Sequence, residues 1–294
     1  MAVIGIDLGT TNSLAGVWQD GKVVLIPNAF GEYLTPSVVG IGKNQEVFVG
    51  SVAKEMLATQ PYDTFREFKR NMGTNFLYGN GRKKYRAEEL SAFVLRRLKE
   101  DAEKFLGEEV TEAVISVPAY FDDNKRNATK NAGRLAGLKV ERLINEPSAV
   151  ALKHHTAEKG AESFIVFDFG GGTLDVSLVE AFDNVVEIQA VAGDNYLGGK
   201  DFNEIIAQDF YEQNQISEAY LTKNEQENVL KEAEAVKKEL TDKNEAERQV
   251  YIKGEAYTLK MTNQRLIHLS AELFSRMAKP IAKVINMVGI ELEE

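Results

Sequence analysis

The apolar positions at the start of the chain fall into two short runs joined by a turn of small residues. Val3–Asp7 and Ser13–Trp18 are rich in aliphatic and β-branched residues and flank the sequence Gly-Thr-Thr at 9–11, a pattern that predicts a β-hairpin. Residues 30–50 mix Gly, Pro and β-branched residues, so we expect short strands and loops there. Trp18, the only tryptophan, is interpreted as a packing residue of the hairpin.

The pattern then changes to a helical period. Apolar residues recur every three to four positions through 87–106, and the glycine at 107 suits a helix end, so we predict one long amphipathic helix. Its predicted buried stripe comprises Leu90, Val94, Leu98, Ala102 and Phe105.

Extended and helical patterns alternate after this helix. The apolar run 112–118 predicts a buried strand, and 121–138 predicts a helix with an aspartate cap. Residues 140–144 predict another strand, followed by a short helix with Pro147 in its first turn. The alternation predicts an α/β fold with a partly parallel sheet, and the polar segment 154–163 is a candidate linker.

The second half of the chain opens with the same pattern as the first. Residues 4–18 read "IGIDLGTTNSLAGVW", and residues 165–180 read "IVFDFGGGTLDVSLVE". Each segment has an apolar strand, an aspartate, a small-residue turn with Thr and a second apolar strand. This single long-period repeat predicts two related lobes rather than a solenoid.

The glycine turns suit contact with an anion. Glycine lets the backbone approach a ligand closely, and successive N–H groups in such a turn form a concave anion site. Neither a P-loop nor a dinucleotide fingerprint is present, and the alternative is a tight hairpin that needs glycine for its geometry alone. Two turns of one design make that alternative weaker, so we expect phosphate oxygens to contact Gly9, Thr10, Thr11, Gly170, Gly171, Gly172 and Thr173.

An aspartate precedes each turn, and a carboxylate beside a phosphate is repulsive unless a cation lies between them. Mg²⁺ keeps several waters and needs few carboxylates when phosphates complete its shell. We therefore expect Asp7 and Asp168 to face each other across a cleft and to hold hydrated Mg²⁺ through water. Either aspartate alone could instead be a simple turn former.

Composition narrows the possible functions. The net charge of −10 opposes a general nucleic-acid or anionic-membrane role, and the absence of cysteine excludes disulfides and thiolate metal sites. Neighbouring His154 and His155 would point about 100° apart on a helix, so they are interpreted as surface residues rather than a chelate. No signal-peptide pattern and no apolar run near ~18 residues is present, and a soluble cytoplasmic protein is expected.

Several motifs, taken together, resemble the nucleotide-binding domain of DnaK-type chaperones, the seventy-kilodalton heat-shock proteins. They follow the family order and cover essentially the whole chain, with some similarity to the divergent bacterial branch HscC. The motifs are "IDLGTTNS", "FKRNMG", "VISVPAYFDDNKR", "LINEPSAVAL", "FDFGGGTLDVS" and "GDNYLGGKDFN".

The resemblance implies an actin-like ATPase fold with two lobes, each built on a ribonuclease-H-like sheet, that close on MgATP. The first lobe would span 1–157, with a small subdomain at about 37–86. The second would span 158–294, with a small subdomain at about 197–273. It would be incomplete, because the family's following strand, with a Gly-Gly-Ser turn, and a later helix do not occur in the sequence. We therefore expect a C-terminally truncated domain with weakened nucleotide binding and an exposed sheet edge in the second lobe.

The same resemblance assigns roles to individual residues. Lys69 would reach the γ-phosphate and the attacking water, and Thr173 would lie beside the γ-phosphate. Glu146 and Asp175 would order the water and further ions, among them K⁺. Without the motif, Lys69 would be taken for a solvated surface lysine.

A second set of roles falls on the helix that contains "ENVLKEAEAVKKELT", residues 227–241. Its predicted buried stripe is Val229, Ala233, Val236 and Leu240. On the resemblance, Glu234 and Lys237 would hold the ribose, and Lys238 and Thr241 would stack on adenine. The alternative is a solvated face with a Glu234–Lys238 ion pair.

Two positions depart from the family pattern. Arginine is usual where Lys238 stands, and an acidic residue is usual where Lys200 stands. A guanidinium stacks on a base better than an ammonium does, so weaker adenine affinity is expected.

The resemblance also implies partners: a J-domain co-chaperone, a nucleotide exchange factor, and client peptides bound only through a domain outside this sequence. Two alternative functions stay open. A small-molecule kinase of the same fold would phosphorylate a hydroxyl acceptor, and a non-catalytic nucleotide sensor would bind ATP or ADP without turnover.

Overall fold

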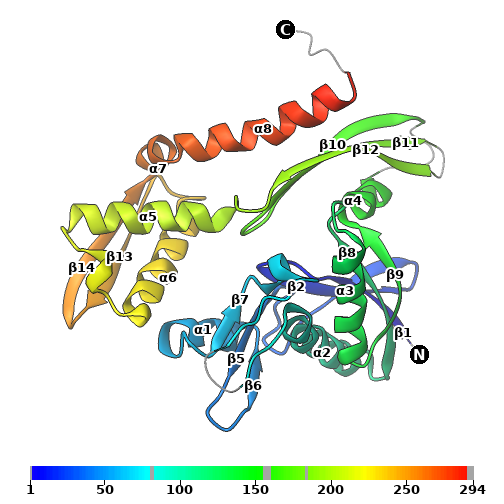
Figure 1. The fold of residues 1–294 in the computed structure, drawn as a ribbon, viewed down its shortest axis with the longest axis horizontal. Coiled ribbons are helices and arrows are strands. Elements are labelled where there is room, and N and C mark those ends of the chain that lie inside the picture. Colours follow the sequence, from blue (N-terminus) through cyan, green and yellow to red (C-terminus); the bar gives the residue numbers. More distant parts are fainter. Residues whose placement is uncertain (1, 80–82, 155–159, 183–184, 290–294) are drawn as a thin grey trace.

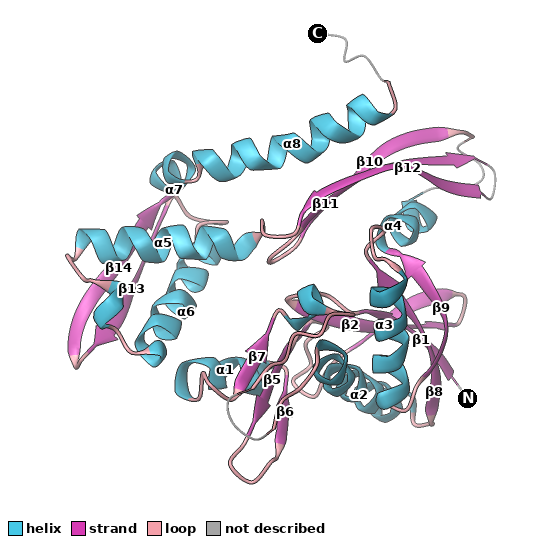
Figure 2. Ribbon diagram, viewed as in Figure 1, coloured by secondary structure: helices cyan, strands magenta, loops and turns pink. Residues whose placement is uncertain are grey.

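A computed structural model of the chain describes residues 2–79, 83–154, 160–182 and 185–289. The elements from β1 to α4 form a first lobe, and those from β10 to α8 form a second lobe beside it (Figures 1 and 2). Among the described residues, every helix is too short or too polar to span a bilayer.

The first lobe is built on a mixed sheet with the strand order β3-β2-β1-β8-β9. The first three strands pair antiparallel as hairpins, and β8 and β9 run parallel to β1 because helices connect them. The short β4 (Thr35–Pro36) pairs with β2. The elements are β1 (Ala2–Asp7), β2 (Asn12–Gln19), β3 (Lys22–Ile26), α2 (Ala87–Leu106), β8 (Val110–Val117), α3 (Asp123–Leu135), β9 (Lys139–Asn145) and α4 (Glu146–His154). The sequence predicted this α/β alternation correctly.

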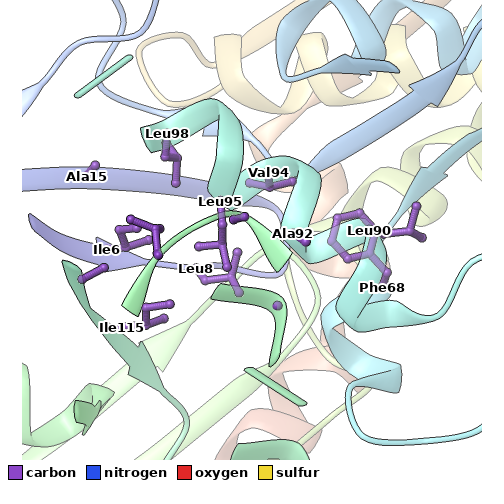
Figure 3. Packing of buried hydrophobic residues seen from close by; sticks show 14 of the residues in the cluster. Ile6, Leu8, Ala15, Phe68, Leu90, Ala92, Val94, Leu95, Leu98 and Ile115 are labelled. Carbon is purple, nitrogen blue, oxygen red and sulfur yellow. The ribbon is translucent and has the colours of Figure 1, made fainter. Parts of the chain in front are cut away.

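Helix α2 supplies much of the core of the first lobe. Four members of its predicted stripe are buried. In Figure 3, the neighbouring Leu95 lies toward Ile6 of β1 and Ile115 of β8, whereas Leu90 lies beside Phe68. The fifth, Phe105, is 44% exposed, so its assignment to the core was wrong. Leu95 is buried instead, because the stripe that faces the sheet is wider than one residue per turn.

Trp18, interpreted from the sequence as a packing residue of the hairpin, lies on strand β2 (Asn12–Gln19) of that hairpin, but its side chain is largely exposed. Ala15 and Val17 of β2 are buried, and side chains alternate between the faces of a strand, so Trp18 lies on the outer face and is 69% exposed. It sits opposite Val23 of β3, which is also exposed.

A smaller unit extends from the first lobe. It contains a three-stranded sheet of order β6-β5-β7 together with a helix and a 3₁₀ turn, in agreement with the short strands expected from residue 30 onward. Its elements are β5 (Val38–Ile41), β6 (Val47–Val49), α1 (Ser51–Thr59), β7 (Thr64–Arg66) and η1 (Phe68–Asn71).

The second lobe repeats the hairpin plan of the first. Strands β10 (Glu162–Phe169), β11 (Leu174–Phe182) and β12 (Val185–Asp194) pair antiparallel, and α8 (Ala271–Met287) packs on β11 and β12. In the described part of the chain, β10 pairs with β11 alone. The predicted linker, with His155, lies partly outside the described residues.

A second helical unit completes this lobe. Helices α5 (Gly199–Gln213), α6 (Lys223–Glu239) and α7 (Asn263–Leu269) pack on one side of the hairpin formed by β13 (Glu245–Ile252) and β14 (Glu255–Thr262). A 3₁₀ turn, η3 (Glu218–Tyr220), precedes α6. The predicted α6 stripe is buried throughout, at Val229, Ala233, Val236 and Leu240. The opposite side of α6 is therefore free to face α1 of the first lobe, as it does in Figure 1.

Candidate functional site

The glycine turns of the two lobes lie against each other. The turn between β1 and β2 carries Thr11, and the turn between β10 and β11 carries Gly171. A Cβ atom at Gly171 would lie only 2.0 Å from Oγ1 of Thr11, so this contact requires glycine. Two segments 160 positions apart in the sequence thus meet at one point between the lobes.

Helix α5 holds the second glycine turn from behind. The N–H of Gly199 donates to the carbonyl of Gly170 at 3.0 Å, and the N–H of Lys200 donates to the carbonyl of Gly171 at 2.8 Å. A Cβ atom at Gly198 would lie 2.3 Å from the Gly172 nitrogen, so the approach again depends on glycine.

The carbonyls of Gly170 and Gly171 are therefore occupied, and the N–H of Gly170 donates to the carbonyl of Thr173 at 2.9 Å. In the described chain, the N–H groups of Gly171, Gly172 and Thr173 have no hydrogen-bond acceptor. Clustered backbone donors of this kind form an anion-binding concavity.

Four carboxylates from both lobes converge beside the turns. Asp7 ends β1, Glu146 begins α4, and Asp168 and Asp175 sit opposite each other on β10 and β11. Burial raises the pKa of Asp168, and the negative charge of Asp7 raises it further. The two metal-ligand candidates therefore interact across the lobes, and Ser116 on β8 positions Asp7 by donating to its Oδ1 at 2.8 Å.

Asp175 is the most perturbed member of this acidic cluster. Burial, with the charges of Glu146 and Asp168, raises the pKa of its carboxyl to about 7. Its Oδ1 is buried without a hydrogen-bond partner among the described residues. An unpartnered buried carboxylate oxygen among like charges fits a nearby cation.

The spacing of the acids limits how these side chains could hold a cation. Within the described residues, no three Asp, Glu or His side chains are arranged to chelate a metal ion directly. A hydrated ion held through water suits this arrangement, because Mg²⁺ retains several waters when few carboxylates bind it.

Lys69 is the cation at the centre of the cluster. It lies on η1, its side chain is only 7% exposed, and its Nζ donates to Oε1 of Glu146 at 2.8 Å. The ring of Phe121 lies 5.7 Å from the same Nζ. Burial raises the pKa of Glu146, whereas Lys69 opposes that increase and Asp7 and Asp168 add to it.

Three of the candidate adenosine residues lie on α6, and Thr241 follows its end. Glu234 accepts hydrogen bonds from Lys54 of α1 at 2.8 and 3.0 Å and lies 2.7 Å from Lys238. Although burial alone would raise the pKa of Glu234, hydrogen bonds from Lys238 and Lys54 lower it to about 2. Burial lowers the pKa of Lys237 to about 8, and its Nζ donates to the Gly199 carbonyl. Lys238 and Thr241 are exposed.

Sequence reasoning missed several neighbours of the site. Burial, with the charges of Asp175 and Glu146, raises the pKa of Tyr120, and Arg70 donates to the Gly172 carbonyl. Tyr120 follows the end of the parallel strand β8, a location where α/β sheets place ligand sites. Lys54 offered no such signal, because its partner lies 180 positions away.

A cavity of about 510 Å³ lies away from the acidic cluster. It lies between α5 and α6 and is lined by Glu204, Tyr211 and Glu227 among others. The buried ionisable side chains and the glycine turns therefore lie between the lobes rather than in this cavity.

Comparison with protein families agrees with this geometry. The family model described as Hsp70 protein matches residues 3–80 and 77–294. Both glycine turns, the four acids and Lys69 fall within the matched residues. The chain has an actin-like ATPase fold with two lobes and belongs to the Hsp70 family.

Proposed function

We propose that this chain is the ATP-binding and ATP-hydrolysing unit of a molecular chaperone, and that its nucleotide state is coupled to client binding by the whole protein. One observation carries the proposal. The contact between Thr11 and Gly171 brings the two glycine turns together beside the buried Lys69 and four carboxylates.

In this proposal the phosphates bind between the two turns. The N–H groups of Gly171, Gly172 and Thr173 bind phosphate oxygens from one side, with Gly170 shaping the turn, and Gly9, Thr10 and Thr11 bind from the other. The free backbone donors of the second turn support this assignment. Thr173 lies beside the γ-phosphate.

The acidic cluster would bind the cations. Asp7 and Asp168 would hold hydrated Mg²⁺ through water, and Glu146 and Asp175 would hold K⁺. Bound Mg²⁺ neutralises charge on the phosphate oxygens. The raised pKa values of Asp168 and Asp175 support a cation site, because burial and neighbouring negative charges disfavour the ionised carboxylates and a bound cation offsets that cost.

Lys69 is proposed as the catalytic cation. Phosphoryl transfer needs positioning and charge stabilisation more than covalent chemistry from the protein. Glu146 fixes the Lys69 ammonium at 2.8 Å, and Asp175, with a pKa of about 7, orders the attacking water and can accept its proton.

The adenosine half of the nucleotide would lie along α6. Glu234 and Lys237 would hold the ribose, and Lys238 and Thr241 would contact adenine. The exposure of Lys238 on α6 and of Thr241 just after α6 supports access for a base. We propose lobe boundaries at 1–157 and 158–294, with small subdomains at about 37–86 and 197–273. We further propose a J-domain co-chaperone and an exchange factor as partners.

The test is hydrolysis by the chain itself. Single-turnover hydrolysis of MgATP, without any acceptor substrate, is expected for the wild type. Lys69→Ala is expected to lower the rate on the order of 10²–10³-fold, because a charge that stabilises the transition state is lost. The matched control is Lys260→Ala, since Lys260 pairs with Glu245 on the β13–β14 hairpin, away from the site.

The outcomes separate the possible functions. ADP and ATP binding without turnover would indicate a non-catalytic nucleotide sensor, and turnover only with an added sugar would indicate a kinase. An unchanged rate in Lys69→Ala would contradict the role of Lys69.

A further inference from the structure

Glu67 connects the two lobes at the edge of the second glycine turn. Its Oε2 lies 2.9 Å from Nζ of Lys200 on α5 and 2.9 Å from Nη1 of Arg70 on η1. Arg70 also donates to the carbonyl of Gly172, and the backbone N–H of Lys200 donates to the carbonyl of Gly171. Both partners of Glu67 therefore also contact the glycine turn, and the five residues form a closed ring.

The backbone of Glu67 supports a special role for its side chain. Glu67 has φ 57° and ψ 19°, the left-handed region, which residues with a Cβ rarely adopt. Such a conformation persists where surrounding contacts hold it, often beside a functional site. The residue directly precedes η1, which carries Lys69.

The ion pairs of Glu67 with Lys200 and Arg70 are partly buried. The side chains of Lys200, Glu67 and Arg70 are 30%, 25% and 13% exposed. Ion pairs in such partly desolvated places are screened less by salt than pairs in open water.

Another ion pair between the lobes serves as a comparison. Arg66 of β7, directly beside Glu67 in the sequence, pairs with Glu227 of α6 at 2.9 Å. Among the described residues, neither Arg66 nor Glu227 forms a hydrogen bond with the glycine turn. The two bridges start from adjacent residues and differ in whether they touch the turn. Comparing variants of the two bridges therefore distinguishes an effect of holding the lobes together from an effect of positioning residues at the site.

We propose that the Glu67 bridge to Lys200 and Arg70 is a clasp that sets the position of the Lys69 turn relative to the second glycine turn. This inference rests on the proposed function and deepens it. Lys200 is then a positioning residue for phosphoryl transfer: it acts through Glu67 on Lys69 and does not itself contact the nucleotide.

The kinetic test uses Lys200→Met, which keeps the apolar length of the side chain and removes its charge. Because misplacement of a catalytic group by about 1 Å can cost on the order of 100-fold in rate, we expect kcat for MgATP to fall on the order of tenfold or more. The KM is expected to change less than about twofold, since the contacts proposed for adenosine are untouched. Lys200→Arg, which restores the cation, is expected to keep a rate near that of the wild type, as is the control Glu227→Gln, which breaks only the Arg66 bridge.

A second measurement requires no turnover. Hydrogen exchange of the segment 67–72 in the nucleotide-free chain should speed up in Lys200→Met and stay unchanged in Lys200→Arg and Glu227→Gln. If the wild type does not hydrolyse ATP, the proposed function fails, while exchange still tests the clasp.

Two results would overturn the clasp. One is a wild-type kcat and unchanged exchange in a folded Lys200→Met variant. The other is an equal loss of kcat in Glu227→Gln, which would mean that any bridge between the lobes has the same effect. Either result would leave ATP hydrolysis by the wild type, and with it the proposed function, intact.

Discussion

The Nζ of Lys69 lies 2.8 Å from Oε1 of Glu146, although 77 positions separate the two residues in the sequence. Both side chains are largely buried. A buried ion pair of this kind is costly to break from one side only, because the remaining charge is left without its partner. The pair therefore fixes the Lys69 ammonium between the two lobes.

Glu146→Gln is expected to release Lys69 from this position. Single-turnover hydrolysis should fall on the order of 10- to 100-fold, because the cation is no longer held where charge develops. ATP affinity, measured by calorimetry, should change much less. A loss of affinity as large as the loss of rate would show that Glu146 acts in binding instead.

The raised pKa of Asp175 predicts that the folded chain becomes less stable as pH rises. Its folded-state pKa is raised from 3.8 to about 7, so between pH 4 and 7 the folded chain binds more protons than the unfolded chain. The free energy of unfolding therefore falls as pH rises through this window and levels off above it. Asp175→Asn should remove this part of the pH dependence in thermal melts recorded with EDTA. Parallel curves for the two proteins from pH 4 to 8 would contradict the assignment.

Magnesium should dominate nucleotide affinity. Burial and the negative charge of Asp7 raise the pKa of Asp168, and phosphates add further negative charge. We expect ADP to bind on the order of tenfold or more weakly in EDTA than in Mg²⁺. The ratio should shrink in Asp168→Asn, which removes one carboxylate; a ratio that is the same in both proteins would rule out a role for Asp168 in metal binding.

Lys54 should control how long a nucleotide stays bound. It ties α1 to Glu234 of α6 at 2.8 Å, across the lobes and beside the proposed ribose site. Lys54→Ala is expected to speed the release of a fluorescent ADP analogue several-fold in stopped-flow experiments, because the bridge closes that end of the cleft. Lys231→Ala breaks the more exposed Lys231–Glu55 bridge between the same helices and is the matched control. Equal acceleration in both variants would assign the effect to α1–α6 contact in general.

Lys238 offers a gain-of-affinity test. It is 68% exposed and pairs with Glu234 at 2.7 Å, so its ammonium is not buried in the protein. Lys238→Arg should keep the ion pair and add a planar group that stacks on adenine, tightening ATP binding a few-fold at most. Calorimetry with ATP and with triphosphate lacking the base distinguishes stacking from a change in charge contacts. No gain with ATP would remove Lys238 from the adenine site.

Local pattern determined much of the architecture. The periodicity of α2 and α6 identified Leu90 and Val229 as core residues because a helix repeats its faces at short range. The same periodicity was wrong for Phe105, because its burial depended on which face of α2 the rest of the fold covered.

The sequence by itself determined that two hairpins exist, each with a small-residue turn preceded by an aspartate. The reason is that the conformation of a turn depends mainly on the residues within it. Only the tertiary structure decided that Thr11 meets Gly171, that Lys69 is buried against Glu146, and that Glu67 reaches Lys200. The reason is physical: each of these contacts joins residues 77 or more positions apart, and their energies depend on burial and on charges supplied by the other lobe. No local pattern of residues encodes those charges.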